Sequence, residues 1–147
     1  MADATDKDPN YWVLCIDDDP FLRLGLESAL GQTKDIEFSA AASKADGMKM
    51  FVEMWNDSRE DAKRKPSLIL LDQDLQGGEK GTDLLGEIID FCGGSPEDAV
   101  KVCMLSASQR QRDWGKAFEL GAIGWIDKAA VTDLDKFPGR LRDIINN

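Results

Sequence analysis

SLILLD, residues 67–72, is an unbroken apolar run that ends in an aspartate. A strand that is apolar on both sides is typical of the centre of a parallel sheet with helices on both faces. Residues 102–105 form a second run of this kind, and the chain alternates between short apolar runs and longer stretches with helical spacing. This alternation indicates parallel pairing through right-handed crossovers, and therefore an α/β fold.

Turn and cap residues delimit the helices between these runs. Pro20 opens the first helix and Gly31 ends it, as is typical of these residue types. Ser43 can cap the second helix, and we place the cap of the last near Asp135, so that Pro138 lies in its first turn. The predicted strands are Tyr11 to Asp17, Asp35 to Ala41, Ser67 to Asp72, Val100 to Ser106 and Ala122 to Asp127.

Composition limits the chemistry. The chain has 147 residues and 42% hydrophobic content, which suits one core. We therefore expect a flexible tail over residues 1–10 and a single domain over residues 11–147. The chain contains no histidine, which excludes Ser-His-Asp and Cys-His catalysis and histidine metal sites. The chain cannot itself be a histidine phosphodonor.

Charge and apolar content also bear on partners and location. With 18 basic and 28 acidic residues the net charge is −10, which argues against direct nucleic-acid binding. No stretch is long and apolar enough for a membrane span, and the first residues do not resemble a signal peptide. The three cysteines lack metal-site spacing and are interpreted as reduced core thiols. These features favour a cytoplasmic protein without a membrane partner.

Polar residues stand where the apolar runs end. Asp17 and Asp18 follow the first run, Asp72 ends the third, Ser106 ends the fourth, and Lys128 follows the fifth. The carboxyl ends of parallel strands form one edge of the sheet, which is where ligands bind in open α/β sheets. The sequence therefore predicts that three carboxylates, a hydroxyl and an ammonium group converge there.

This set of groups suits phosphoryl transfer. Crowded carboxylates need a cation, and hard oxygen ligands suit Mg²⁺, so Asp17, Asp18 and Asp72 are the predicted metal ligands. The backbone carbonyl of Asp74 is a further candidate ligand. Asp72 is also the candidate nucleophile, because a carboxylate that attacks phosphorus forms an acyl phosphate. Lys128 and Ser106 would pair with the phosphoryl oxygens, whereas Asp19, which precedes a proline, is better explained as a helix cap.

Several stretches together resemble the receiver domain of two-component response regulators, in the superfamily of chemotaxis-type regulators, from about Trp12 to Ile145. The matching stretches are an apolar strand ending in paired acids at residues 13–20, the strand before the phosphoacceptor at 66–72, a Ser-Ala element at 104–107, and the Gly-Ala segment leading to a lysine at 121–128. Their order along the chain makes the resemblance specific.

The resemblance implies a flavodoxin-like, doubly wound sheet of five parallel strands in the order 2-1-3-4-5, with five helices. It implies that Asp72 accepts a phosphoryl group from a histidine of a sensor kinase or phosphotransfer protein in a Mg²⁺-dependent reaction. Such a phosphorelay switch catalyses its own phosphorylation and slow dephosphorylation and is not a metabolic enzyme. Ser106 and Trp125 occupy the switch positions. Residues 110–147 are the expected surface for a homodimer or a downstream effector.

Two positions depart from the family pattern. Gln76 stands where a proline is usual, and the following loop looks one residue longer. Ala129 replaces the proline that usually follows the lysine in a cis peptide. Because a cis bond before a residue other than proline costs about 2.5–4 kcal/mol, Lys128-Ala129 is either trans with altered lysine placement or strained.

Two other functions remain open. Leu71-Asp72-Gln73-Asp74 also fits the Asp-x-Asp motif of haloacid dehalogenase-like phosphatases, but those enzymes usually begin with the nucleophile strand. The other alternative is a binding module that has lost phosphorylation. Such a module is expected to lack one of the acids, the hydroxyl or the lysine, and all of them are present.

Overall fold

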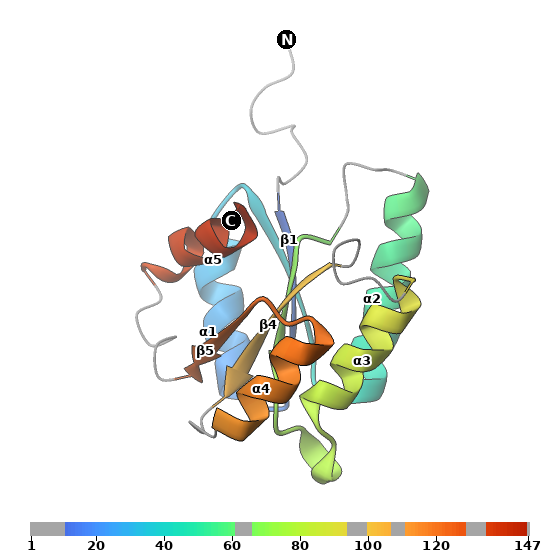
Figure 1. Ribbon diagram of the computed structural model, residues 1–147. Helices are drawn as coiled ribbons and strands as arrows, with labels where there is room; N and C mark the ends of the chain where they lie inside the picture. Colours follow the sequence, from blue (N-terminus) through green and yellow to red (C-terminus); the bar gives the residue numbers. More distant parts are fainter. Residues whose placement is uncertain (1–10, 61–65, 94–99, 107–110, 129–134, 147) are drawn as a thin grey trace.

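A five-stranded parallel sheet forms the centre of the molecule in the computed structural model, which describes residues 11–60, 66–93, 100–106, 111–128 and 135–146. The strand order is β2-β1-β3-β4-β5, as the resemblance implied (Figure 1). The predicted strands are confirmed to within one or two residues at each end. Their bounds are β1 Tyr11–Ile16, β2 Ile36–Ala41, β3 Leu68–Asp72, β4 Lys101–Ser106 and β5 Gly124–Asp127.

Helices cover both faces of this sheet, with α1 and α5 on one face and α2, α3 and α4 on the other (Figure 1). A short 3-10 turn, η3, lies between β3 and α3. The bounds are α1 Pro20–Gly31, α2 Lys44–Glu60, η3 Gln76–Gly78, α3 Gly81–Phe91, α4 Gln111–Leu120 and α5 Phe137–Asn146. None of these helices is long and apolar enough within the described ranges to cross a membrane.

The sheet separates two apolar cores. One contains Leu14, Ile69 and Met104 from the strands, packed against α2, α3 and α4. The other contains Cys15, Leu70 and neighbouring side chains, packed against α1 and α5. All five residues of β3 are buried, because this central strand is covered on both faces. Cys15 and Cys103 are buried thiols of this second core, as the sequence predicted, whereas Cys92 is only partly buried.

Side-chain caps fix where the first two helices begin. The Asp19 carboxylate accepts hydrogen bonds from the backbone N–H groups of Phe21 and Leu22, directly ahead of α1. The Ser43 hydroxyl accepts one from the N–H of Asp46 at the start of α2. Both predicted caps are therefore confirmed, and they satisfy N–H groups that the helix itself leaves without partners.

Candidate functional site

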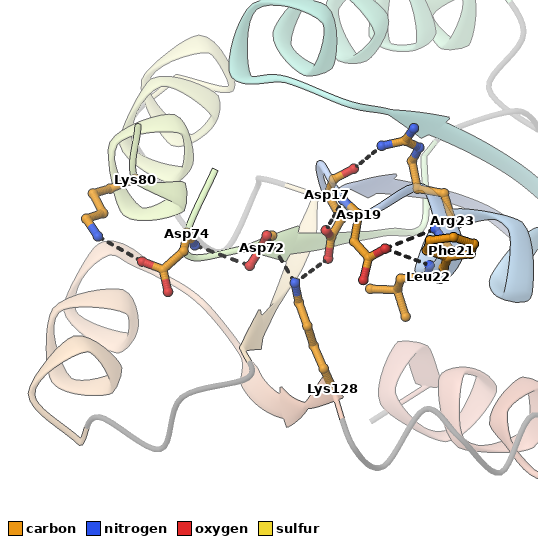
Figure 2. Close-up of polar contacts among 9 residues, drawn as sticks. All are labelled: Asp17, Asp19, Phe21, Leu22, Arg23, Asp72, Asp74, Lys80 and Lys128. Atoms are coloured by element: carbon orange, nitrogen blue, oxygen red, sulfur yellow. Dashed lines mark hydrogen bonds and ion pairs between the residues drawn. The ribbon is translucent and has the colours of Figure 1, made fainter. Parts of the chain in front are cut away.

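The carboxyl ends of β1, β3, β4 and β5 lie at one edge of the sheet and carry the predicted polar residues. Figure 2 shows three of them, Asp17, Asp72 and Lys128, pointing toward one another. Asp17 follows β1 and is completely buried, and Asp72, the last residue of β3, is 3% exposed. Ser106 ends β4 and is also buried, one residue beyond Leu105, the partner of Asp72 in the ladder. Lys128 follows β5 and is half-buried.

Lys128 bridges the two buried carboxylates. Its Nζ lies 2.8 Å from Oδ2 of Asp17 and 3.1 Å from Oδ2 of Asp72. Figure 2 shows the side chain extending from β5 toward the space between the ends of β1 and β3. One ammonium group therefore faces two carboxylates, so the buried group of three side chains carries an excess of negative charge when both acids are ionised.

Local backbone turns orient the second oxygen of each carboxylate. Oδ1 of Asp17 accepts a hydrogen bond of 2.8 Å from the N–H of Asp19. Oδ1 of Asp72 accepts one of 3.2 Å from the N–H of Asp74. Aspartate side chains commonly bond the backbone two residues ahead in this way. In both residues one oxygen is thus held by the chain, while the other faces Lys128.

Burial changes the proton affinity of these groups. Loss of hydration, reinforced by the nearby charge of Asp17, raises the pKa of Asp72 from 3.8 to about 7. The positive charge of Lys128 opposes this rise. For Lys128, burial alone would lower the pKa, but the hydrogen bond to Asp17 and the charge of Asp72 outweigh burial, so its pKa is raised. Lys128 therefore remains positively charged at neutral pH.

Asp18 completes a cluster suited to a hard cation. Asp17, Asp18 and Asp72 each offer a carboxylate oxygen, and these oxygens lie within 4.8 Å of one another. All the donors are oxygens, and two of the three residues are buried. Among the described residues, Lys128 pairs with two of these carboxylates, and the guanidinium group of Arg23 donates a hydrogen bond to the backbone carbonyl of Asp17. This donor set fits a magnesium ion, which is bound through one or two carboxylates and keeps several waters.

The side chain of Asp74 turns away from this cluster, as Figure 2 shows. Its Oδ1 lies 2.8 Å from Nζ of Lys80, and the two residues also form an isolated antiparallel bridge. The position of its backbone carbonyl as a metal ligand stays a prediction. Sequence reasoning missed Lys80 as the partner of Asp74, because their contact depends on the path of the loop between them.

Main-chain contacts close that loop. The N–H of Gly81 donates to the carbonyl of Gln73 at 2.9 Å, and the N–H of Leu75 donates to that of Glu79 at 3.0 Å. Gly77 and Gly78 have φ values of 75° and 78°, which favour glycine. The loop thus turns through two glycines in the left-handed region, and the extra residue inferred from the sequence stays a prediction.

Gln73 is a second residue whose role the sequence did not indicate. Its buried side chain accepts a hydrogen bond of 3.1 Å from the N–H of Thr82 in the first turn of α3. Gly81 packs so closely that an added Cβ would lie 2.2 Å from the carbonyl oxygen of Asp72. The start of α3 is therefore held directly against the end of β3.

The remaining predicted positions lie on β5 and beyond it. Trp125 is half-buried and packs against the core under α2, α3 and α4, and it is opposite Met104 in the β4–β5 ladder. The Lys128-Ala129 bond, the predicted tail at residues 1–10 and parts of the predicted 110–147 surface lie outside the described residues.

Comparison with known proteins places this site in context. A family model described as the response regulator receiver domain matches residues 13–136. A search of curated proteins finds no match. The phosphorylated cyanobacterial phytochrome response regulator RcpA is similar in structure, with a TM-score of 0.72 and 19% identity over 94% of this chain and 95% of that one.

Two further solved structures have the same fold. The response regulator TrrA from Thermotoga maritima, in complex with Mg(2+)-BeF, has a TM-score of 0.67 and 19% identity, with 91% of this chain and 98% of that chain covered. The receiver domain of the NarL response regulator from Mycobacterium tuberculosis has a TM-score of 0.67 and 20% identity over 95% and 99% of the two chains.

Proposed function

The chain belongs to the response regulator receiver domain family, and we propose that Asp72 is its phosphoacceptor. The observation that carries this proposal is the double contact of Lys128, whose Nζ lies 2.8 Å from Asp17 and 3.1 Å from Asp72. A cation at this point can pair with an oxygen of a phosphoryl group on Asp72 as negative charge develops there. The buried hydroxyl of Ser106, next to the same strand end, is the proposed second contact.

The proposed donor is a phosphohistidine of a sensor kinase or phosphotransfer protein. An oxygen of the Asp72 carboxylate attacks phosphorus, an O–P bond forms, and the P–N bond to the donor breaks. The histidine nitrogen leaves with the bonding electrons and is neutral after accepting a proton. The nucleophile must be ionised for this step, and the charge of Lys128 favours the ionised form of Asp72 against the effect of burial.

We propose that Asp17, Asp18 and Asp72 hold a magnesium ion during this reaction. When bound, the ion neutralises charge on the phosphoryl oxygens. The convergence of the three carboxylates within 4.8 Å supports this assignment. The hydrogen bond from Asp19 N–H to Asp17 keeps one oxygen of Asp17 in a fixed orientation, so the ligand is partly preorganised.

Phosphorylation would then be transmitted through Ser106 and Trp125. Ser106 ends β4 and Trp125 lies on the adjoining strand, in register with Met104. We propose that a phosphoryl group on Asp72 shifts the population of two arrangements of these residues, which needs a difference of only a few kcal/mol. The altered surface, within residues 110–147, would contact a downstream effector or a second copy of the chain.

Intact-protein mass after incubation with acetyl phosphate and Mg²⁺ tests the proposal. We expect the natural chain to gain one phosphoryl group that is labile to alkali. This group should not form when EDTA is present in the incubation, and it should not form in Asp72→Asn. Asp74→Asn is the matched control, because that carboxylate lies two residues away but faces Lys80, and it should still be phosphorylated.

Two results would overturn the assignment. Steady phosphate release without accumulation of the adduct would favour a phosphatase of the haloacid dehalogenase type. Absence of both adduct and turnover, together with failure to form a beryllofluoride complex, would favour a phosphorylation-independent binding module.

A further inference from the structure

A cavity of about 350 Å³ lies between the edge of the sheet and α5, away from the carboxylate cluster. β5 is the last strand of the sheet, and Figure 1 shows it at the outer edge with α5 on the same side of the molecule. The walls are apolar side chains that include Ile123 and Ile144, and two basic residues, Lys101 and Arg140, complete the lining. The volume falls at the lower end of the range of small-molecule sites, which is about 300–1,000 Å³.

Gly124 lines this cavity without a side chain and so leaves a recess in its wall. A Cβ added to Gly124 would point toward Cys103 on the adjacent strand, with its nearest contact 3.5 Å from Sγ. Residue 124 therefore faces the α1 and α5 side of the sheet, where other strand positions carry side chains. A glycine within a strand often marks a place where another group approaches closely. Here the missing side chain opens space above the buried thiol of Cys103.

The basic residues at the cavity differ in their bonding. The Lys101 ammonium group donates a hydrogen bond to the carbonyl of Ile145 near the end of α5. No carboxylate in the described part of the chain pairs with Arg140. Burial raises the pKa of the Cys103 thiol to about 12, and the positive charge of Arg140 opposes this rise. Arg140 and Cys103 both line the cavity, so the guanidinium group borders the same space as the buried thiol.

Arg140 is thus a cation without a carboxylate partner among the described residues, and it borders an apolar recess. A complementary occupant needs an apolar body to cover Ile123, which is 45% exposed, and an anionic group to face Arg140. Charge complementarity thus favours an anion over a neutral or basic occupant.

We propose that this cavity binds a small amphipathic anion, with an aromatic or aliphatic body in the Gly124 recess and a carboxylate or sulfonate group against Arg140. The body would be about the size of one or two rings, given the cavity volume of about 350 Å³. Binding does not require phosphorylation of Asp72, so this proposal can succeed or fail independently of the proposed function.

A titration of the full chain with naphthalene-2-sulfonate tests the proposal, with 2-naphthol as a neutral probe of similar shape. Binding is followed by amide chemical shifts in ¹⁵N-labelled protein, which also report whether each variant is folded. We expect saturable shifts at Gly124 and its neighbours, and affinity for the sulfonate about three to ten times that for the naphthol.

Two variants locate the site, and a third is a control. Gly124→Val fills the recess and should weaken both probes at least about tenfold, because the apolar contact is lost. Arg140→Gln should weaken the sulfonate about three- to tenfold and leave the naphthol unchanged. Lys49→Gln, an exposed position on α2, removes the same charge elsewhere and should affect neither probe. If Gly124→Val perturbs shifts throughout the spectrum, Gly124→Ala replaces it with a smaller expected loss.

Three outcomes would overturn the proposal. The first is absence of saturable shifts in the natural chain, and the second is equal affinity of the natural chain and Arg140→Gln for the sulfonate. The third is sedimentation evidence for a dimer that covers Ile123 and Gly124 at the concentrations of the titration, which would make a second copy the occupant of this face.

Discussion

Asp72→Asn should stabilise the metal-free protein, because the site holds more buried negative charge than Lys128 can offset. Burial and the charge of Asp17 raise the pKa of Asp72 from 3.8 to about 7. Folding therefore disfavours the ionised carboxylate. The cost is fully present above about pH 7 and decreases as the pH falls toward 3.8, the value expected in the unfolded chain.

The magnitude follows from the same two values. At about 1.36 kcal/mol per pKa unit, the difference between 3.8 and about 7 corresponds to about 4 kcal/mol at alkaline pH. The amide of the variant is neutral but must still be buried, which costs part of this gain. We therefore expect Asp72→Asn to raise the free energy of unfolding at pH 8 by about 2–4 kcal/mol.

Urea denaturation in EDTA, followed by circular dichroism at pH 8 and at pH 5, measures this effect. The difference between variant and natural chain should fall by more than half from pH 8 to pH 5. Asp74→Asn is the control, because its side chain is 57% exposed and should change stability by no more than about 0.5 kcal/mol. Equal stability of Asp72→Asn and the natural chain at pH 8, or a difference independent of pH, would refute the electrostatic account.

Three shorter predictions concern metal binding at the carboxylate cluster, the ion pair between Asp35 and Arg142, and two glycines of α3. Mg²⁺ at ten times its dissociation constant should stabilise the natural chain by about 1.4 kcal/mol in the same assay, and Asp18→Asn should reduce this increment. Asp35→Asn should lower the free energy of unfolding by about 0.5–1 kcal/mol at pH 7, because it removes the bidentate, partly exposed pair with Arg142. The hydrogen bond from Arg142 lowers the pKa of Asp35, so this contribution to stability should persist above pH 3.8 and disappear as the pH falls further. Gly81→Ala should lower the free energy of unfolding, measured by thermal denaturation, by more than about 2 kcal/mol, since its Cβ would lie 2.2 Å from a carbonyl oxygen. Gly86→Ala, with open space around its Cβ, should instead stabilise α3 by about 0.5–1 kcal/mol.

The strands and the convergent site residues could be predicted because one physical rule determines both. Leu68 to Leu71 are apolar on both faces, which identifies a central strand, and its last residue must then lie at the carboxyl edge of the sheet. Asp17 and Lys128 follow their strands in the same way. Their positions directly after the strands were therefore enough to predict that these groups lie at one edge of the sheet.

Contacts across loops could not be predicted in this way. The pairing of Asp74 with Lys80, and of Gln73 with Thr82, depends on how the chain turns through Gly77 and Gly78. Both central glycines have positive φ, and a run of loop residues does not reveal such a turn in advance. The cavity is a similar case, because the recess at Gly124 exists only once α5 packs against the sheet.

The edge strand β5 connects the two proposed sites. It is only four residues long, from Gly124 to Asp127, and pairs with β4 alone. Lys128, directly after its last residue, contacts Asp17 and Asp72, while Gly124 opens the cavity at its other end. A group bound to Asp72 that draws Lys128 toward it would act on the same short strand as an anion beside Gly124.

Thermodynamic reciprocity makes this connection testable. If Mg²⁺ and beryllofluoride change the affinity for naphthalene-2-sulfonate by some factor, the sulfonate must change the affinity for beryllofluoride by the same factor. We expect a factor of about 5 or more, the lower end of typical coupling between sites. The ¹⁵N titration described above, repeated on the beryllofluoride complex, measures it directly. Equal affinities in the two states would show that β5 moves as part of a rigid sheet and that the cavity is independent of the phosphorylation site.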